Sequence, residues 1–107
     1  MSYYNIFLDD NRTAPKLGGY NTVRSYKGCI SLLMVFGEEL NKISLDYDLG
    51  DINETGYDVL VYMKENGIKP KYINIHSDHP EGARVMVKYA HEHFKESIIS
   101  NQTIDKR

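Results

Sequence analysis

Short runs rich in aromatic and branched residues alternate along this chain with longer stretches in which apolar residues recur at helical spacing. The short runs predict strands, at residues 3–9, 21–26, 42–48 and 71–77. The longer stretches predict helices, at residues 27–40, from Thr55 to Gly67 and from Pro80 onward. Parallel neighbours need crossover connections, so this alternation predicts an α/β domain built on a parallel sheet with helices on both faces.

Two segments break the alternation. Between the first two predicted strands lies "NRTAPKLGGY", whose proline and glycines predict a loop where a helix would otherwise stand. The last segment, "SIISNQTIDKR", is consistent with a frayed helix, a short edge strand or a mobile tail that begins near residue 98.

Length and composition limit the chain to a few classes of protein. Its 107 residues suffice for a single domain over residues 1–107 with one hydrophobic core. The formal net charge of −2 supplies no general field for nucleic acid, so we expect no recognition of a DNA sequence. Cys29 is the only cysteine, which predicts a buried thiol in a reducing compartment. The longest apolar run, "LLMVF", is too short to span a bilayer, so we expect a cytoplasmic protein without a membrane partner.

Polar side chains follow three of the predicted strands at the point where each strand ends. They are, in chain order, Asp9 and Asp10, Asp46 and Asp48, and His76 and Ser77. The carboxyl ends of neighbouring parallel strands meet at one edge of a sheet, so we expect these side chains to converge. Clustered carboxylates repel one another unless a cation neutralises them, and oxygen ligands of this kind suit Mg²⁺ or Mn²⁺. The four aspartates are therefore the predicted metal ligands.

Several of these residues also have a purely structural interpretation. Asp48 is either a metal ligand or a cap of the turn that follows it. The guanidinium fork of Arg12 suits a phosphate, and it equally suits a salt bridge to Asp48 or Asp51. His76 is either a general acid or base, or a core imidazole that bonds to the backbone. Ser77 and the start of the helix that follows it would present a hydroxyl and N–H groups to a phosphate.

Four spaced motifs resemble a known family. "IFLDD", "SLDYDLG" and "INIHS" are similar to segments of the receiver domains of response regulators. The set "FLDDNRTAP", "SLDYDLG", "TGYDVL" and "HSDHPEGARVM" resembles a divergent branch, the cyclic-phosphate processing receiver domain, up to about residue 90. By this resemblance Asp9 and Asp10 stand at the metal-binding pair and Asp46 at the phospho-acceptor position. Two residues depart from the pattern: Tyr47 replaces a histidine, and His79, which replaces an asparagine, would supply the missing imidazole.

The resemblance implies a small receiver-like (flavodoxin-like) α/β fold. Its parallel sheet would have four main strands in the order 2-1-3-4, flanked by helices. The first helix would be replaced by a loop, and the fifth strand would be reduced or absent.

The resemblance also implies a function, the divalent-metal-dependent hydrolysis of a cyclic phosphate on a nucleotide or RNA end. The expected partner is a phosphate-containing small molecule or an RNA terminus, and the expected cofactor is Mg²⁺ or Mn²⁺. The roles assigned are catalysis by His76, Asp46 and Ser77, substrate binding by Arg12, Ser77 and His79, and metal binding by Asp9, Asp10, Asp46 and Asp48.

Three other functions remain open from the sequence. The chain would be a metal-dependent phosphatase of linear esters if Asp46 is a nucleophile, or a phospho-acceptor signalling module if Asp46 is phosphorylated without turnover. It would be a non-catalytic binder if it sequesters a cyclic nucleotide signal in phage–bacterial defence. Ordinary receivers carry a lysine after a fifth strand. No lysine has that context here, since Lys88 and Lys95 fall in the last predicted helix, and this weakens the signalling interpretation.

Overall fold

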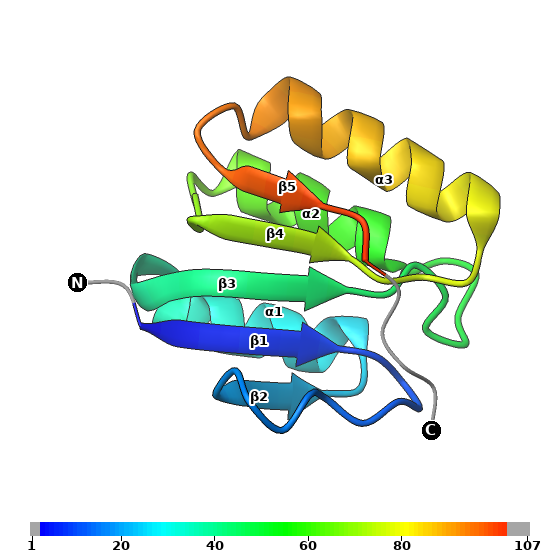
Figure 1. The fold of residues 1–107 in the computed structure, drawn as a ribbon, viewed down its shortest axis with the longest axis horizontal. Coiled ribbons are helices and arrows are strands. Elements are labelled where there is room, and N and C mark those ends of the chain that lie inside the picture. The colour runs from blue at the N-terminus through cyan, green and yellow to red at the C-terminus, as the bar shows by residue number, and fades with distance from the viewer. Residues whose placement is uncertain (1–2, 103–107) are drawn as a thin grey trace.

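The structure is a computed structural model that describes residues 3–102. Its elements are β1 (Tyr4–Leu8), β2 (Tyr20–Val23), α1 (Tyr26–Phe36), the 3₁₀ turn η1 (Gly37–Glu39), β3 (Leu40–Leu45), α2 (Gly56–Glu65), β4 (Tyr72–Ile75), α3 (Pro80–His93) and β5 (Ile98–Ser100). All neighbouring strands are parallel, and the order across the sheet is β2-β1-β3-β4-β5. The arrowheads of all five strands therefore point toward the same edge of the sheet (Figure 1).

The predicted strand order 2-1-3-4 is confirmed, and a fifth strand, β5, is present but only three residues long. The loop expected in place of a helix between β1 and β2 is confirmed for residues 9–19. The ambiguous last segment forms an edge strand at residues 98–100, and its final residues, 103–107, lie outside the described residues. The third strand ends at Leu45, earlier than predicted, so Asp46 follows the strand instead of lying within it.

The three helices α1, α2 and α3 pack against the same face of the sheet, and not against both faces as the sequence predicted. The crossovers that contain them all step in one direction, from β2 past β1 to β3, then to β4 and β5. Right-handed crossovers that step in one direction place their helices on one face. The step from β1 to β2 runs the other way, and it has a loop instead of a helix. No helix within residues 3–102 is long and apolar enough to cross a membrane.

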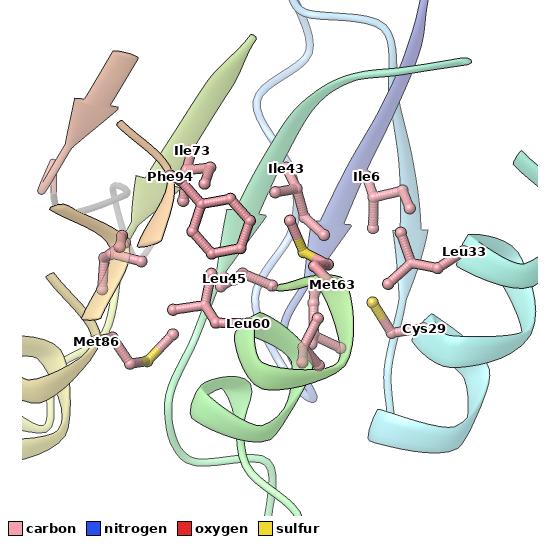
Figure 2. Close-up of a cluster of buried hydrophobic side chains, with 14 of the residues drawn as sticks. Ile6, Cys29, Leu33, Ile43, Leu45, Leu60, Met63, Ile73, Met86 and Phe94 are labelled. Carbon is pink, nitrogen blue, oxygen red and sulfur yellow. The ribbon is translucent and has the colours of Figure 1, made fainter. Parts of the chain in front are cut away.

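The hydrophobic core lies between the helices and the face of the sheet that they cover. Alternate residues of β1, β3 and β4 point into it, and Figure 2 shows Ile6, Ile43 and Ile73 directed toward the helices. Leu33 of α1 and Met63 of α2 meet them from the opposite side. The core also contains the thiol of the only cysteine, which is buried as predicted. Burial raises its pKa to about 12, so the thiol stays protonated and inert.

The opposite face of the sheet carries a row of side chains at one level. Phe7, Ser44, Asn74 and Ser100 are register partners on successive strands, so their side chains point to the same side. The first three are buried. This face is therefore polar at its centre, whereas the helix-covered face is apolar.

The start of α2 lies directly against the end of β3. Gly56 is the first residue of the helix, and its N–H donates to the Tyr47 carbonyl at 3.0 Å. A Cβ atom at Gly56 would lie 1.9 Å from the Asp46 carbonyl oxygen, so only glycine allows this approach. Thr55 precedes it as the N-cap, and the Thr55 N–H donates to the Asp58 carboxylate at 2.8 Å. The close approach holds the backbone of Asp46 in place.

Candidate metal and phosphate site

Three buried polar side chains meet where β1, β3 and β4 end. Asp9, Asp46 and His76 each follow one of these adjacent parallel strands, and one ligating atom from each lies within 4.8 Å of the others. Their exposed fractions are 1%, 8% and 0%. The prediction that these three residues lie at the carboxyl ends of neighbouring strands is confirmed. Two carboxylates and an imidazole this close together form a set of donors that a divalent cation can use.

Asp9 is the most heavily hydrogen-bonded member of the group. Its Oδ1 accepts from the backbone N–H groups of Asn11 at 2.8 Å and Arg12 at 2.7 Å, and its Oδ2 lies 3.0 Å from His76 Nε2. Burial alone would raise the pKa of Asp9, but these donors outweigh burial and hold the pKa below its usual value. Asp9 is therefore an anion throughout the neutral range.

Asp46 has the opposite electrostatic environment. Burial, and then the negative charge of Asp9, raise the pKa of Asp46 to about 6, while a hydrogen bond from Ser77 and the charge of Arg12 act against the rise. Two neighbouring carboxyl groups thus have pKa values that are pushed apart. A bound cation would stabilise the ionised form of Asp46 against both its burial and the charge of Asp9, which is the behaviour expected of a metal site.

A cleft of about 330 Å³ opens beside this group. It is lined by Asp9, Asp10, Asn11 and Arg12 after β1, by Asp46 and Asp48 after β3, and by Ser77, Asp78 and His79 after β4. Two of the four predicted metal ligands, Asp10 and Asp48, lie on this cleft but outside the buried group of three. Asp48 Oδ1 accepts from the Gly50 N–H at 2.9 Å, so Asp48 caps its turn, which is the structural alternative considered for it.

Arg12 crosses from the loop after β1 to the end of β4. Its Nη1 donates to the His76 carbonyl at 2.7 Å, its Nη2 pairs with Asp78, and its Nε lies 3.9 Å from Asp9 Oδ2. The salt bridge from Arg12 to Asp48 or Asp51, which was the structural alternative for Arg12, is not formed among the described residues. Arg12 supplies a positive charge to the cleft next to the two buried carboxyl groups.

His76 is a core residue that supports the site from beneath. Its Nδ1 lies 2.7 Å from the Ser44 hydroxyl, its Nε2 faces Asp9, and its ring stacks on Phe7 at 4.6 Å with an interplanar angle of 3°. Burial lowers the pKa of His76, and Asp9 opposes this in part. His76 is not among the residues that line the cleft. His76 is thus buried in the core, as one of its two interpretations from the sequence expected. Its ring nitrogens, however, bond to side chains and not to the backbone.

Ser77 and His79 line the cleft at the start of α3. Ser77 Oγ accepts from the His79 N–H at 3.0 Å, and His79 is the N-cap of the helix, with Nδ1 accepting from the Gly82 N–H at 2.8 Å. The His79 ring also lies 4.7 Å from the ring of Tyr47, the other residue that departs from the family pattern. With Nδ1 engaged in the cap, Nε2 is the ring atom left to interact with a ligand.

Three residues of the site were missed from the sequence. Arg24 donates to the backbone carbonyls of Asp9, at 3.1 Å, and of Arg12, at 2.6 Å, and so braces the loop after β1. The Ser44 hydroxyl contacts His76 Nδ1, and Asn74 Nδ2 donates to that hydroxyl. A signal for these last two was present, because Ser44 and Asn74 each lie two residues before a site residue, at the spacing that places side chains on one face of a strand.

Comparison with known families gives one match. The family model described as "Cyclic-phosphate processing Receiver domain" matches residues 4–92. The matched range contains β1 to β4 and every residue that lines the cleft. No curated protein and no solved structure matches the chain.

Proposed function

The chain belongs to the cyclic-phosphate processing receiver domain family, and from this membership we propose that it hydrolyses, in the cytoplasm, a cyclic phosphate on a nucleotide or an RNA end with the help of Mg²⁺ or Mn²⁺. The observation that carries the proposal is the pair of buried carboxyl groups of Asp9 and Asp46. Their pKa values are pushed apart on a cleft that also presents the guanidinium of Arg12. A cation and a phosphate are the two ligands that satisfy this combination of charges.

Asp9 and Asp46 would hold the cation, with Asp10 and Asp48 close enough on the same cleft to contribute oxygens directly or through water. The donor set fits Mg²⁺ or Mn²⁺, which bind a few carboxylates and keep several waters. When bound, such a cation supplies Lewis-acid polarisation of the phosphoryl oxygen and acidifies water.

The residues after β1 and β4 would hold the phosphate. Arg12 places a charged fork at the cleft, and its existing bonds to Asp78 and to the His76 carbonyl orient that fork. Ser77 offers a hydroxyl, and His79 offers Nε2–H, which would donate a hydrogen bond to the ribose oxygen as the cyclic ester opens, while the proton for that oxygen comes from water. Each of these side chains is anchored by a neighbour, so little ordering is needed when substrate binds.

His76 has a different place in this proposal from the one that the sequence suggested. Direct acid–base catalysis by His76 stays a prediction, but a buried ring with both nitrogens hydrogen-bonded favours action through Asp9. We therefore treat His76 as a positioning residue that holds the carboxylate of Asp9, and His79 as the imidazole that touches substrate.

The test is a screen of cyclic phosphates with purified protein. The substrates are a 2′,3′-cyclic mononucleotide, a 3′,5′-cyclic mononucleotide, an RNA with a 2′,3′-cyclic end and a cyclic dinucleotide, each with Mg²⁺, Mn²⁺ or a chelator. We expect hydrolysis of at least one class with metal, none with chelator, and a loss of roughly 10²-fold or more in Asp46→Asn. Asp51→Asn is the control, because Asp51 is an exposed acid of the same loop outside the cleft.

A different result would support a different function. Tight binding of a cyclic nucleotide without hydrolysis under any condition would overturn the enzyme proposal and favour a binder. Hydrolysis of linear phosphate esters alone would favour a phosphatase in which Asp46 is the nucleophile.

A further inference from the structure

A continuous chain of hydrogen bonds runs from Asp9 through the sheet to the segment after β5. His76 Nε2 lies 3.0 Å from Asp9 Oδ2, and His76 Nδ1 lies 2.7 Å from the Ser44 hydroxyl. Asn74 Nδ2 lies 3.0 Å from the same hydroxyl, and Asn74 Oδ1 accepts from the backbone N–H of Gln102 at 3.0 Å. The three central residues of this chain are buried, so water does not compete for their partners.

The far end of the chain determines the direction of every bond in it. A backbone N–H can only donate, so the Asn74 atom that faces the N–H of Gln102 is the acceptor Oδ1. The amide nitrogen Nδ2 is then the atom that faces Ser44, and it also lies 3.4 Å from the Gln102 carbonyl oxygen, which can only accept. The orientation of the Asn74 amide is thus dictated by a backbone segment, a partner whose own donor and acceptor cannot exchange.

The direction passes from Asn74 to His76 through one hydroxyl. Ser44 Oγ accepts from Asn74 Nδ2, so its single proton is free to point at His76 Nδ1, which lies 2.7 Å away, while the ionised carboxylate of Asp9 at Nε2 can only accept. Nδ1 is therefore an acceptor, and the proton of the imidazole is on Nε2, where it is donated to Asp9 Oδ2. Every donor in the chain faces an acceptor, and no buried side-chain polar atom among residues 3–102 lacks a partner.

We propose that Ser44 and Asn74 are positioning residues that fix the proton of His76 on Nε2 and thereby hold the carboxylate of Asp9 in its metal-binding orientation. A nitrogen that carries this proton is not available as a ligand, so the carboxylates, and not His76, would bind the cation. In this consequence for the metal the inference rests on the proposed function. The placement of the proton rests on the hydrogen bonds alone.

A row of buried polar residues needs such an explanation. Ser44 and Asn74 are buried residues within β3 and β4, where apolar residues of similar size would need no hydrogen-bond partners. The helix-covered face of the same strands uses isoleucine and leucine at the neighbouring positions. The chain of hydrogen bonds is continuous from Asp9 at the cleft to Gln102, so the direction of the bond at Gln102 can determine the direction of the bond at Asp9.

The direct test is the proton pattern of the His76 ring, measured by long-range ¹H–¹⁵N correlation NMR on the full chain without metal. In wild type we expect the proton on Nε2 and none on Nδ1. In Asn74→Asp an acceptor oxygen replaces the donor nitrogen and Ser44 turns its proton toward residue 74. Nδ1 then takes a proton from water to bond to Ser44, while Nε2 keeps its proton for Asp9, so both ring nitrogens carry protons. Ser100→Ala is the matched control, because the Ser100 hydroxyl donates to the other atom, Asn74 Oδ1, at 2.7 Å. It should keep the wild-type pattern.

A second measurement covers the case in which Asn74→Asp does not fold. Ser44→Ala removes the donor to Nδ1, and we expect the affinity for Mn²⁺, measured by calorimetry, to fall by about tenfold, as is usual for residues that orient a ligand. Ser100→Ala should stay within about twofold of wild type.

Three results would overturn the inference: a wild-type proton on Nδ1, the same ring pattern in wild type and Asn74→Asp, or equal Mn²⁺ affinity in Ser44→Ala and wild type. If wild type binds no Mn²⁺, the metal part of the proposed function fails, and the ring pattern still decides whether the proton is placed as inferred.

Discussion

His76 Nε2 lies 3.0 Å from Asp9 Oδ2, across 67 residues of sequence. This contact joins the ends of β1 and β4, which are not neighbours in the sheet, because β3 lies between them. The imidazole therefore reaches across the end of β3, and it contacts Asp9 Oδ2, whereas the backbone donors of the loop after β1 bond to Oδ1. Asp9 is fixed from two directions before any ligand binds.

Two substitutions of His76 separate a positioning role from direct acid–base catalysis. His76→Gln can place an amide N–H near the position of Nε2, whereas in His76→Asn the shorter side chain leaves Asp9 without that donor. We expect Mn²⁺ affinity to fall by roughly 10- to 100-fold in His76→Asn and much less in His76→Gln, measured by calorimetry. If His76 is instead the acid or base, both variants will bind Mn²⁺ normally and turnover will drop by roughly 10²–10⁴-fold.

The pKa of Asp46 predicts how the stability of the metal-free protein changes with pH. Folding raises this pKa from 3.8 to about 6, so the folded state holds the proton more tightly than the unfolded state does. The stabilisation from Asp46 is complete below pH 4 and is lost as the pH rises through 6, by about 3 kcal/mol in all. Asp9 acts in the opposite sense, because its lowered pKa gives stability that is lost at low pH.

Asp46→Asn isolates this contribution. Urea unfolding with chelator should show that the difference in unfolding free energy between wild type and Asp46→Asn shifts in favour of the variant by about 2 kcal/mol from pH 4 to pH 7. A difference that stays constant over this range would show that the carboxyl group of Asp46 is not perturbed.

Divalent metal should stabilise the folded protein through the buried carboxylates. At a Mn²⁺ concentration 100 times the dissociation constant, binding adds about 2.7 kcal/mol, or about 10 °C in Tm for a domain of this size. We expect Asp46→Asn to abolish the shift and Asp10→Asn to reduce it, since Asp10 lies on the cleft but outside the buried group. Differential scanning calorimetry of these variants with Asp51→Asn as control makes the comparison. Equal shifts in all four proteins would place the metal elsewhere.

Because α2 lies so close to the end of β3, we expect that adding one methyl group at Gly56 strongly lowers the free energy of unfolding. Gly56→Ala would place Cβ 1.9 Å from the Asp46 carbonyl oxygen, so the helix must move, at a cost of about 3 kcal/mol or more. Gly67→Ala is the comparison: φ is +68° and no atom lies within 4 Å of its Cβ, so only backbone strain of about 1 kcal/mol is expected. Urea unfolding measures both, and similar losses would contradict the role given to Gly56.

Chemical phosphorylation distinguishes the proposed enzyme from a signalling receiver. Within the described residues no lysine lines the cleft to pair with an aspartyl phosphate. We therefore expect acetyl phosphate to leave Asp46 unlabelled, as measured by intact mass and by trapping of the acyl phosphate with hydroxylamine. Stoichiometric labelling that is absent in Asp46→Asn would favour the signalling function.

Much of the arrangement could be predicted because it depends on local sequence and on one rule of sheet geometry. Asp9, Asp46 and His76 end strands that alternate with helices, and the ends of parallel strands converge. The faces of the sheet were harder to predict. The number of helices does not say in which direction each crossover steps. Because the single reversed step, from β1 to β2, is made by a loop, one face of the sheet has no helix among residues 3–102.

The partners of long or buried side chains could not be predicted for a physical reason. Arg12 has several carboxylates within reach in sequence, and only the folded loop brings Asp78 to it. The roles of Ser44 and Asn74 depend on strand register and on the direction of each hydrogen bond, which no spacing in the sequence specifies. The pKa of Asp46 depends likewise on burial and on a charge from another strand.

The chain of hydrogen bonds from Asp9 to Gln102 also affects how the newly synthesised protein folds. A polypeptide that emerges from the ribosome releases β1 before the other four strands, yet β1 pairs with both β2 and β3, and the residues that complete the Asp9 site extend to Gln102. Pairing between distant strands makes assembly late and slow compared with helix formation. A nascent or truncated chain that stops before β4 lacks His76 and therefore cannot assemble the Asp9 site. We expect such a chain to expose unpaired strand edges and to be sensitive to proteases.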